Sequence, residues 1–206
     1  QIEHAISQVA RQRHRNLELV LVLHNMSEDP SVVRDKALAA GIPEVKVLTA
    51  DPDWTLGEVL NHGIAHAEGE LIAKMDDDNI YGELYLYDLL RAFDYATADM
   101  VGKGAHYTYF PATNTTVLRL PGLEHRYAHL IQGATLLAKA DLLREIPFEA
   151  VNAGEDTRLV RRCKEEGIRI YSADRFNFIY VRGADARAHT WQAPDYKLLR
   201  NAQFCF

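Results

Sequence analysis

The chain has very little cysteine and no long apolar run. Its only cysteines, Cys163 and Cys205, are far apart and match no zinc-ligand spacing, so we expect reduced thiols and a cytoplasmic setting. The longest apolar runs, such as Leu19 to Leu23, are far too short to span a bilayer. The chain opens with Gln-Ile-Glu-His and no apolar signal core, so we also expect no secretory signal.

The chain also lacks an excess of basic charge and the glycine pattern of a phosphate-binding loop. A net charge of -6 argues against a general nucleic-acid binder, which would present a basic surface. The sequence has no Walker-type glycine-rich loop, no dinucleotide-binding fingerprint and no Gly-x-Ser-x-Gly elbow. ATP hydrolysis, hydride transfer and serine hydrolysis therefore lack support. No repeat, low-complexity tract or linker divides the chain, so we expect a single domain over residues 1–206.

The first half alternates strands with helices. Apolar runs predict strands at 17–23, 45–48 and 70–75. Helical periodicity predicts helices near 2–10, 32–40 and 55–67. Thr55 and Glu58 have the spacing of a capping box at the start of the last of these. Strands and helices alternating at this interval indicate βα units and a mostly parallel sheet.

The second half is richer in strands. We predict helices at 85–96, 141–145 and 155–166. We predict strands at 100–110, 115–120, 132–139, 168–172 and 177–181. The whole therefore predicts an α/β fold of Rossmann type with a mixed sheet flanked by helices. Its parallel half is expected over about 1–98 and its mixed half over about 99–206.

Three consecutive aspartates, Asp76, Asp77 and Asp78, follow the strand predicted at 70–75. Adjacent carboxylates repel one another, and a divalent cation such as Mg²⁺ or Mn²⁺, which prefers oxygen ligands, makes them favourable. Since α/β folds bind ligands at the carboxyl ends of strands, we expect a metal-and-phosphate site here. An acidic turn in solvent is the alternative. An EF-hand loop is excluded because Ile80 stands where that loop needs an oxygen ligand. A phosphatase fold with an Asp-x-Asp motif ranks lower, because it would place the motif nearer the chain start.

Two further segments are candidates for chemistry. Gly154-Glu155-Asp156 opens the helix predicted at 155–166, where the helix dipole alone stabilises acidic residues. The functional alternative is a carboxylate general base that deprotonates an acceptor hydroxyl. His189 follows a strand and a glycine-containing loop, and it is either a late metal ligand or an exposed loop histidine.

Taken in order, these segments resemble the family-2 glycosyltransferases of the GT-A fold. Residues 16–22 resemble the family's second strand, and residues 56–65 resemble its helix with Gly, Asn and small residues. Residues 69–78 are similar to its strand and metal motif, Gly133-Ala134 to its acceptor-side strand, and Glu155-Asp156 to its catalytic pair. The resemblance covers nearly the whole chain, and the order and spacing of the motifs make it specific.

The resemblance implies an inverting, metal-dependent transfer of a sugar from a nucleotide-diphosphate sugar, with UDP-sugar favoured, to a hydroxyl of a glycan or another acceptor. It implies that Mn²⁺ or Mg²⁺ is held by Asp76, Asp78 and His189. Asp156 would be the base, with Glu155 beside it. The implied donor contacts are His24, Asn25, Asn61, Asp76 and Asp77. A non-catalytic nucleotide-sugar or glycan-binding module and a sugar nucleotidyltransferase stay open as alternatives.

The chain departs from the family in two places. His24-Asn25 stands where the family often has an Asp pair that contacts the base, so the resemblance does not decide which nucleobase the donor carries. The family also opens with a strand and a polar turn, so we expect a larger native polypeptide that extends upstream of Gln1. That apolar strand would lie between 17–23 and 71–75. The resemblance further implies cytoplasmic, bacterial glycan biosynthesis, with peripheral membrane association through the acceptor.

Overall fold

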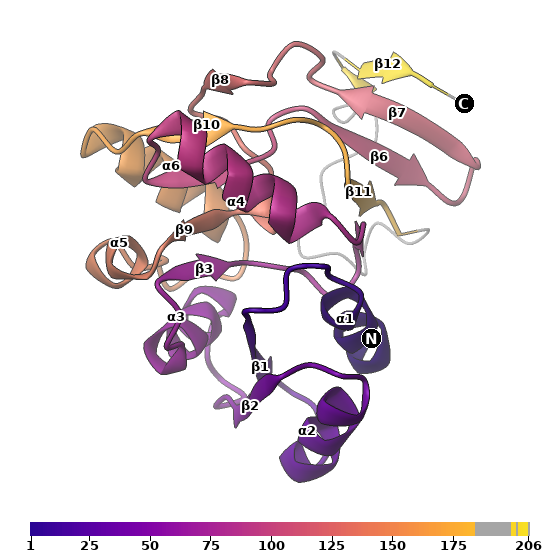
Figure 1. Cartoon of the computed structure of the whole chain (residues 1–206), viewed down its shortest axis with the longest axis vertical. Helices are drawn as coiled ribbons and strands as arrows, with labels where there is room; N and C mark the ends of the chain where they lie inside the picture. Colours follow the sequence, from indigo (N-terminus) through magenta and orange to yellow (C-terminus); the bar gives the residue numbers. More distant parts are fainter. Residues whose placement is uncertain (184–198, 201, 206) are drawn as a thin grey trace.

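The computed structural model describes residues 1–183, 199–200 and 202–205 of the chain (Figure 1). The first elements are α1 (Ile2–Ala10), β1 (Glu18–Leu23), α2 (Pro30–Ala39), β2 (Glu44–Thr49), α3 (Leu56–His66) and β3 (Leu71–Ala73). Next come β4 (Ile80–Tyr81), α4 (Tyr85–Ala96), β5 (Met100–Gly102), β6 (His106–Phe110), β7 (Thr115–Arg119) and β8 (Arg126–Tyr127). The last are the 3₁₀ turn η1 (Gly133–Thr135), β9 (Leu137–Lys139), α5 (Ala140–Glu145), α6 (Glu155–Glu165), β10 (Ile170–Ser172), β11 (Phe178–Val181) and β12 (Ala202–Phe204).

Local sequence signals set the helix starts in the first half. Asp29 caps α2 by accepting a hydrogen bond from the backbone N–H of Ser31, and Pro30 takes the first helical position. Thr55 and Glu58 form the predicted capping box at the start of α3, with both reciprocal hydrogen bonds present. These contacts satisfy N–H groups that the first turn leaves without helical partners. The helix starts therefore depend on residues close by in the sequence.

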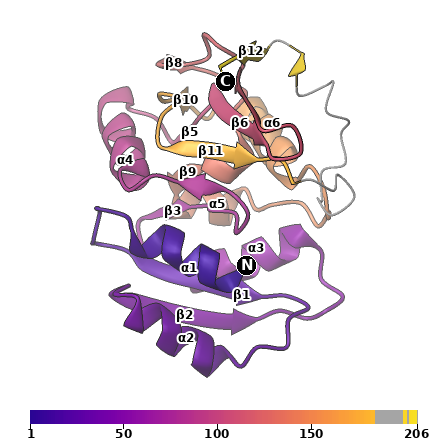
Figure 2. The ribbon, with the colours of Figure 1, turned by 90° about the vertical axis from the view of Figure 1, so that its right-hand side faces the viewer.

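In the part of the chain that the structure describes, the strands form three sheets. β1 and β2 make a two-stranded parallel sheet, in register from Glu18–Glu44 to Leu23–Thr49. A five-stranded sheet has the order β3-β9-β5-β10-β8, and another has the order β12-β7-β6-β11-β4. β3 pairs with β9 in antiparallel fashion, so this sheet contains strands from both sides of the expected boundary near residue 98. Figure 2 shows α1 and α2 beside β1 and β2, with β3 and β9 above them.

Two predicted strands of the second half are interrupted. The strand predicted at 100–110 breaks into β5 and β6, because the backbone of Lys103 donates to Thr135 Oγ1 and that of Gly104 donates to Ser172 Oγ. A Cβ on Gly104 would lie 2.9 Å from Ser172 Oγ, so the close approach requires glycine. The strand predicted at 132–139 begins instead with the 3₁₀ turn η1. Both interruptions depend on contacts between segments distant in the sequence.

Apolar side chains form three main clusters. One packs α4 against β5, β10 and β11, and a second packs α5 and α6 against β9. The third joins α1 and α2 to β1 and β2. Leu17 and Met75 border both the first and the third cluster, which links the two-stranded sheet to the rest of the molecule. Within the part of the chain that the structure describes, no helix has the length and apolar character needed to cross a membrane.

Candidate active site

The three aspartates follow β3 where the strand leaves its sheet. Asp76 is partly buried, whereas Asp77 and Asp78 lie in an exposed turn that leads to β4. Just before them, the backbone N–H of Lys74 donates to the Leu136 carbonyl at 2.8 Å, which keeps the chain attached to the segment before β9. The acids therefore lie at the carboxyl end of β3, the edge at which α/β folds bind ligands.

Lys74 brings a buried positive charge to these carboxylates. Its Nζ donates to Asp76 Oδ1 at 2.5 Å, and only 10% of the lysine side chain is exposed. Burial disfavours the ammonium, but the Asp76 carboxylate outweighs it and raises the pKa of Lys74 above its ordinary value. Glu155 and Asp156 act in the same direction. Lys74 therefore stays charged, and its charge interacts with the acids of both the aspartate turn and the start of α6.

Two buried polar side chains hold the aspartate turn in place. The Tyr81 hydroxyl accepts a hydrogen bond from the Asp76 N–H at 2.8 Å and donates to the Ala134 carbonyl at 2.9 Å. Asn79 is fully buried, and its Oδ1 accepts from the Val181 N–H at 3.0 Å. The turn is thereby fixed to η1 on one side and to β11 on the other. Such fixed positions are what a binding site for a charged group requires.

Asp156 packs directly against η1. Gly154 caps α6 in the left-handed region, with φ of 73°, and Asp156 Oδ1 accepts from the Thr157 N–H at 2.6 Å. A Cβ built on Gly133 would lie 1.8 Å from Asp156 Oδ2, so only glycine leaves room for this carboxylate. Since η1 also holds the Tyr81 hydroxyl through Ala134, the start of α6 and the aspartate turn share one support.

Glu155, the residue before Asp156 in the first turn of α6, is only 6% exposed. Burial raises the pKa of Glu155 above its ordinary value, and the charges of Asp156 and Asp76 raise it further, whereas Lys74 opposes the shift. These mutual effects show that the strand-end acids and the helix-start acids share one electrostatic environment. The structure thus brings together Asp76, Glu155 and Asp156, which the sequence separates widely.

The predicted nucleotide contacts have different surroundings. His24 is half-buried and Asn25 is exposed at the carboxyl end of β1, and the side chains of both approach the Pro52 carbonyl at 3.3 Å. Asn61 is instead tied to a backbone segment, donating to the Phe148 carbonyl at 2.9 Å and accepting from the Phe148 N–H at 3.0 Å. Asn61 thus links α3 to the segment before α6, and this geometry gives no support to a nucleotide contact there.

The predicted metal ligands are only partly described. His189 lies outside the described residues, among which no three His, Cys, Asp or Glu side chains gather in a way that could hold a metal ion. The carboxylates of Asp76 and Asp78 suit a hard cation such as Mn²⁺ or Mg²⁺, which keeps waters and takes substrate phosphate oxygens as further ligands. The donor set of the turn therefore fits such an ion when a diphosphate is present.

Sequence reasoning missed the residues that support the acids. Lys74 and Tyr81 carry no motif, because their roles depend on Asp76, η1 and α6 meeting in three dimensions. The signal that could have pointed to Lys74 is its position, since a lysine inside a predicted buried strand needs a charged partner. Gly133 was noted only as part of an apolar strand, and its close contact with Asp156 has no sequence signal.

The α/β fold and the carboxylates at its strand ends define a protein of the GT-A type. The sequence profile of glycosyl transferase family 2 matches residues 1–142, and the chain belongs to this family. No curated protein matches the chain in sequence.

Solved structures show the same fold. The mannosyltransferase PcManGT from Pyrobaculum calidifontis, in complex with GDP-Man and Mn²⁺, is 16% identical, with a TM-score of 0.68 over 91% of this chain and 54% of that one. TarS 1-349 from S. aureus, in complex with UDP-GlcNAc, is 15% identical, with a TM-score of 0.66 over 97% of this chain and 60% of that one. The chain therefore spans just over half the length of these two solved chains, and 34% of a longer solved chain of TarS.

Proposed function

We propose that the protein transfers a sugar from a nucleotide-diphosphate sugar to an acceptor hydroxyl, with inversion at the anomeric carbon and with a divalent metal ion. The observation that carries this proposal is that η1 supports both groups of acids: its Ala134 carbonyl holds the Tyr81 hydroxyl that binds Asp76, and its Gly133 packs against Asp156. One group of acids lies at a strand end, where a diphosphate binds, and the other lies at a helix start beside it. Membership of glycosyl transferase family 2 supports this reading.

Asp156 is proposed as the general base. Its Oδ1 accepts from the Thr157 N–H, which leaves Oδ2, beside Gly133, to receive the proton of the acceptor hydroxyl. As the proton leaves, the acceptor oxygen forms a bond to the anomeric carbon and the bond from that carbon to the diphosphate oxygen breaks. The electron pair of the broken bond departs with the nucleoside diphosphate. One displacement of this kind inverts the anomeric centre.

Asp76 and Asp78 are the proposed metal-binding residues, with His189 as a further candidate. When bound, Mn²⁺ or Mg²⁺ supplies positive charge that stabilises the departing diphosphate. Lys74 holds Asp76 in place and limits the repulsion between the two groups of acids. The Mn²⁺ in the complex of the mannosyltransferase from Pyrobaculum calidifontis supports the choice of metal.

A UDP-sugar is the favoured donor. TarS is solved with UDP-GlcNAc, whereas the mannosyltransferase is solved with GDP-Man, so both bases occur in proteins of this fold. The half-buried His24 and the exposed Asn25, at the carboxyl end of β1, are the proposed contacts to the base or ribose. The proposed acceptor is a glycan or another hydroxyl compound, in a cytoplasmic setting.

A non-catalytic nucleotide-sugar-binding module is the second candidate, favoured by one observation. β1 and β3, the strands on either side of the proposed donor site, belong to separate sheets. Among the described residues, no backbone ladder therefore joins the two strands that flank the proposed donor site. The two candidates differ in turnover, since a binding module would retain the donor without releasing nucleoside diphosphate.

A thermal-shift screen tests the proposal. The natural polypeptide is mixed with UDP-sugars and GDP-sugars, each with Mn²⁺ and with a chelator. We expect one donor to raise the Tm with Mn²⁺ only, and Asp78→Ala to remove this dependence. Asp141→Ala is the matched control, because Asp141 is an exposed acid in the first turn of α5. Equal donor affinity with chelator and with Mn²⁺ would contradict a metal-dependent site.

A further inference from the structure

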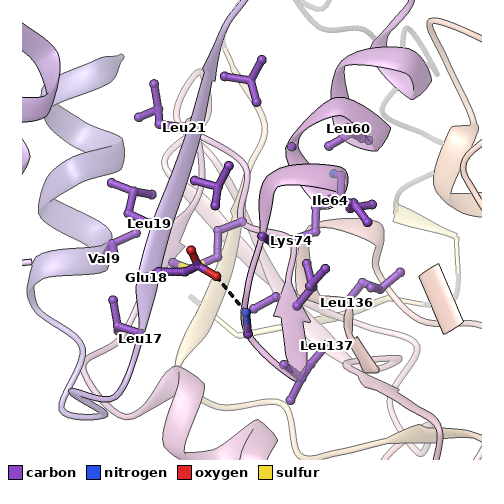
Figure 3. A pocket seen from close by; sticks show the side chains of 18 of the residues that line it. Val9, Leu17, Glu18, Leu19, Leu21, Leu60, Ile64, Lys74, Leu136 and Leu137 are labelled. Carbon is purple, nitrogen blue, oxygen red and sulfur yellow. Dashed lines mark hydrogen bonds between the residues drawn. The ribbon is translucent and has the colours of Figure 1, made fainter. Parts of the chain in front are cut away.

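Helix α1 has an apolar side and a buried polar side. Val9 lies beside Leu19 of β1 (Figure 3), and Ile6 belongs to the same apolar cluster, as expected for a helix that packs on a sheet. On the polar side, Gln8 is 3% exposed, and Gln12, just after the helix, is 1% exposed. Because buried amides need hydrogen-bond partners, their contacts show what this side of α1 holds in place.

The partners are backbone groups of the segment that follows the aspartate turn. Among the described strands, β4 lies at the edge of its sheet and pairs with β11 alone. The N–H of Tyr81 donates to Gln8 Oε1 at 2.9 Å, and His4 Nε2 lies 2.9 Å from the Asn79 carbonyl. Side chains of α1 therefore satisfy backbone groups along a strand that lacks a second neighbouring strand in the described part of the chain.

Gln12 continues this line of contacts toward α4. Its Nε2 donates to the Gly82 carbonyl at 2.9 Å and to the Gln8 carbonyl at 3.0 Å. Its Oε1 accepts from the Leu86 N–H at 3.1 Å. The first turn of α4 leaves this N–H without a helical partner, and the N-cap residue of α4 forms no side-chain bond to it. The polar side of α1 thus holds both β4 and the start of α4.

Tyr81 connects these contacts to the aspartate turn. Its hydroxyl accepts a hydrogen bond from the Asp76 N–H at 2.8 Å. Its ring is completely buried and packs against Tyr85 and Phe178, with ring centroids 4.8 Å and 5.3 Å away. A side chain packed in this way has little freedom to adjust, so its hydroxyl keeps the contact only while its backbone stays where Gln8 holds it.

We propose that Gln8 and Gln12 are positioning residues for the metal site. Together they hold β4 and the start of α4, and Gln8 fixes the backbone of Asp76 through the Tyr81 hydroxyl. This inference rests on the proposed function, because it assigns the two amides to the metal ion that Asp76 and Asp78 are proposed to bind. Loss of a residue that orients a metal ligand from behind typically lowers metal affinity by roughly 10–100-fold.

Removal of the Gln8 acceptor tests this inference. Gln8→Met keeps the length of the side chain but leaves the Tyr81 N–H without a partner, and Tyr81→Phe removes the bond to the Asp76 N–H. With UDP present, we expect each variant of the natural polypeptide to bind Mn²⁺ about tenfold more weakly in calorimetry. Leu143→Ala is the control for lost stability, because Leu143 is buried in the separate apolar cluster of α5 and α6. Its Mn²⁺ affinity should not change.

A double variant separates positioning from a general loss of stability. If Gln8 acts through the Tyr81 hydroxyl, the two changes remove the same link. Gln8→Met should therefore weaken Mn²⁺ binding little further in a chain that already carries Tyr81→Phe. Losses that multiply in the double variant would overturn the route through Tyr81. A loss of Mn²⁺ affinity in Leu143→Ala equal to that in Gln8→Met would overturn the positioning role, because stability alone would then explain both.

Amide hydrogen exchange tests the same link without metal. In the metal-free chain the Tyr81 hydroxyl protects the Asp76 N–H. We expect this amide to exchange faster in Gln8→Met than in the unchanged chain or in Leu143→Ala. Unchanged exchange at Asp76 in Gln8→Met would overturn the inference. Failure of the unchanged chain to bind Mn²⁺ would instead contradict the proposed function, and the exchange result would still decide whether α1 fixes the aspartate turn.

Discussion

Acid should destabilise the protein through His106 on β6. The side chain is almost completely buried, its Nδ1 lies 3.2 Å from the Gly104 carbonyl, and its Nε2 has no hydrogen-bond partner among the described residues. Burial disfavours the imidazolium, and Arg119, opposite His106 on β7, adds repulsion. The pKa of His106 is thereby lowered from 6.5 to about 3. Nδ1 must carry the ring proton to donate to Gly104.

The sign and size of the effect follow from this shift. The unfolded chain protonates the histidine below about pH 6.5, and the folded chain does so only below about pH 3. Between these values the unfolded state binds more protons, so the free energy of unfolding falls as the pH falls. From pH 7 to pH 5 the loss is about 2 kcal/mol, at roughly 1.4 kcal/mol for each pH unit below 6.5.

Urea denaturation followed by far-UV circular dichroism measures this loss. His106→Gln keeps an uncharged donor for Gly104, so the pH 7 to pH 5 loss in the variant should be smaller by about 2 kcal/mol. His129→Gln is the matched control, because His129 is exposed, and it should lose as much stability as the unchanged chain. If His106→Gln loses as much stability as the unchanged chain, His106 is not the neutral buried group described here.

Three further substitutions test the supports of the site. Gly133→Ala should lower turnover with little effect on donor affinity in steady-state kinetics, because the added Cβ lies 1.8 Å from the proposed base; unchanged turnover would refute the contact. Lys74→Met should lower the free energy of unfolding in urea by about 3 kcal/mol, against less than about 1 kcal/mol for the more exposed Lys139→Met; equal losses would refute the buried pair. Asn61→Leu should cost about 2 kcal/mol in the same assay, because it leaves two backbone groups before α6 without partners; a neutral result would contradict the link.

Elements whose signals are local could be predicted from the sequence. Helix α4 occupies residues 85–96 as its apolar period predicts, and α3 begins at the Thr55 capping box. The break between β5 and β6 could not be predicted, because it depends on Gly104 meeting Ser172 from a distant strand. Local periodicity describes the chain's own hydrogen bonds and apolar face, but not the close approach of another segment.

The candidate site likewise combines residues that the sequence indicates with contacts that only the structure shows. The Asp76 to Asp78 turn and the Glu155-Asp156 helix start were recognisable from residue type and position. Their proximity followed only from the family resemblance, since no spacing in the sequence encodes it. The structure adds the physical links, which are the hydrogen bond from Lys74 to Asp76, the Tyr81 hydroxyl between Asp76 and Ala134, and the contact of Gly133 with Asp156.

The central claim is that Asp156 removes the acceptor proton at a site shared with the strand-end aspartates. The most direct measurement is donor-dependent release of nucleoside diphosphate by the natural polypeptide and its Asp156→Asn variant, with Mn²⁺ and an acceptor. Asp141→Asn, a change of an exposed acid in the first turn of α5, is the matched control. We expect Asp156→Asn to lower turnover by roughly 10²–10⁴-fold with donor affinity nearly intact, and the control to remain active. Near-normal turnover by Asp156→Asn would show that Asp156 only stabilises the start of α6 and would contradict the proposed mechanism.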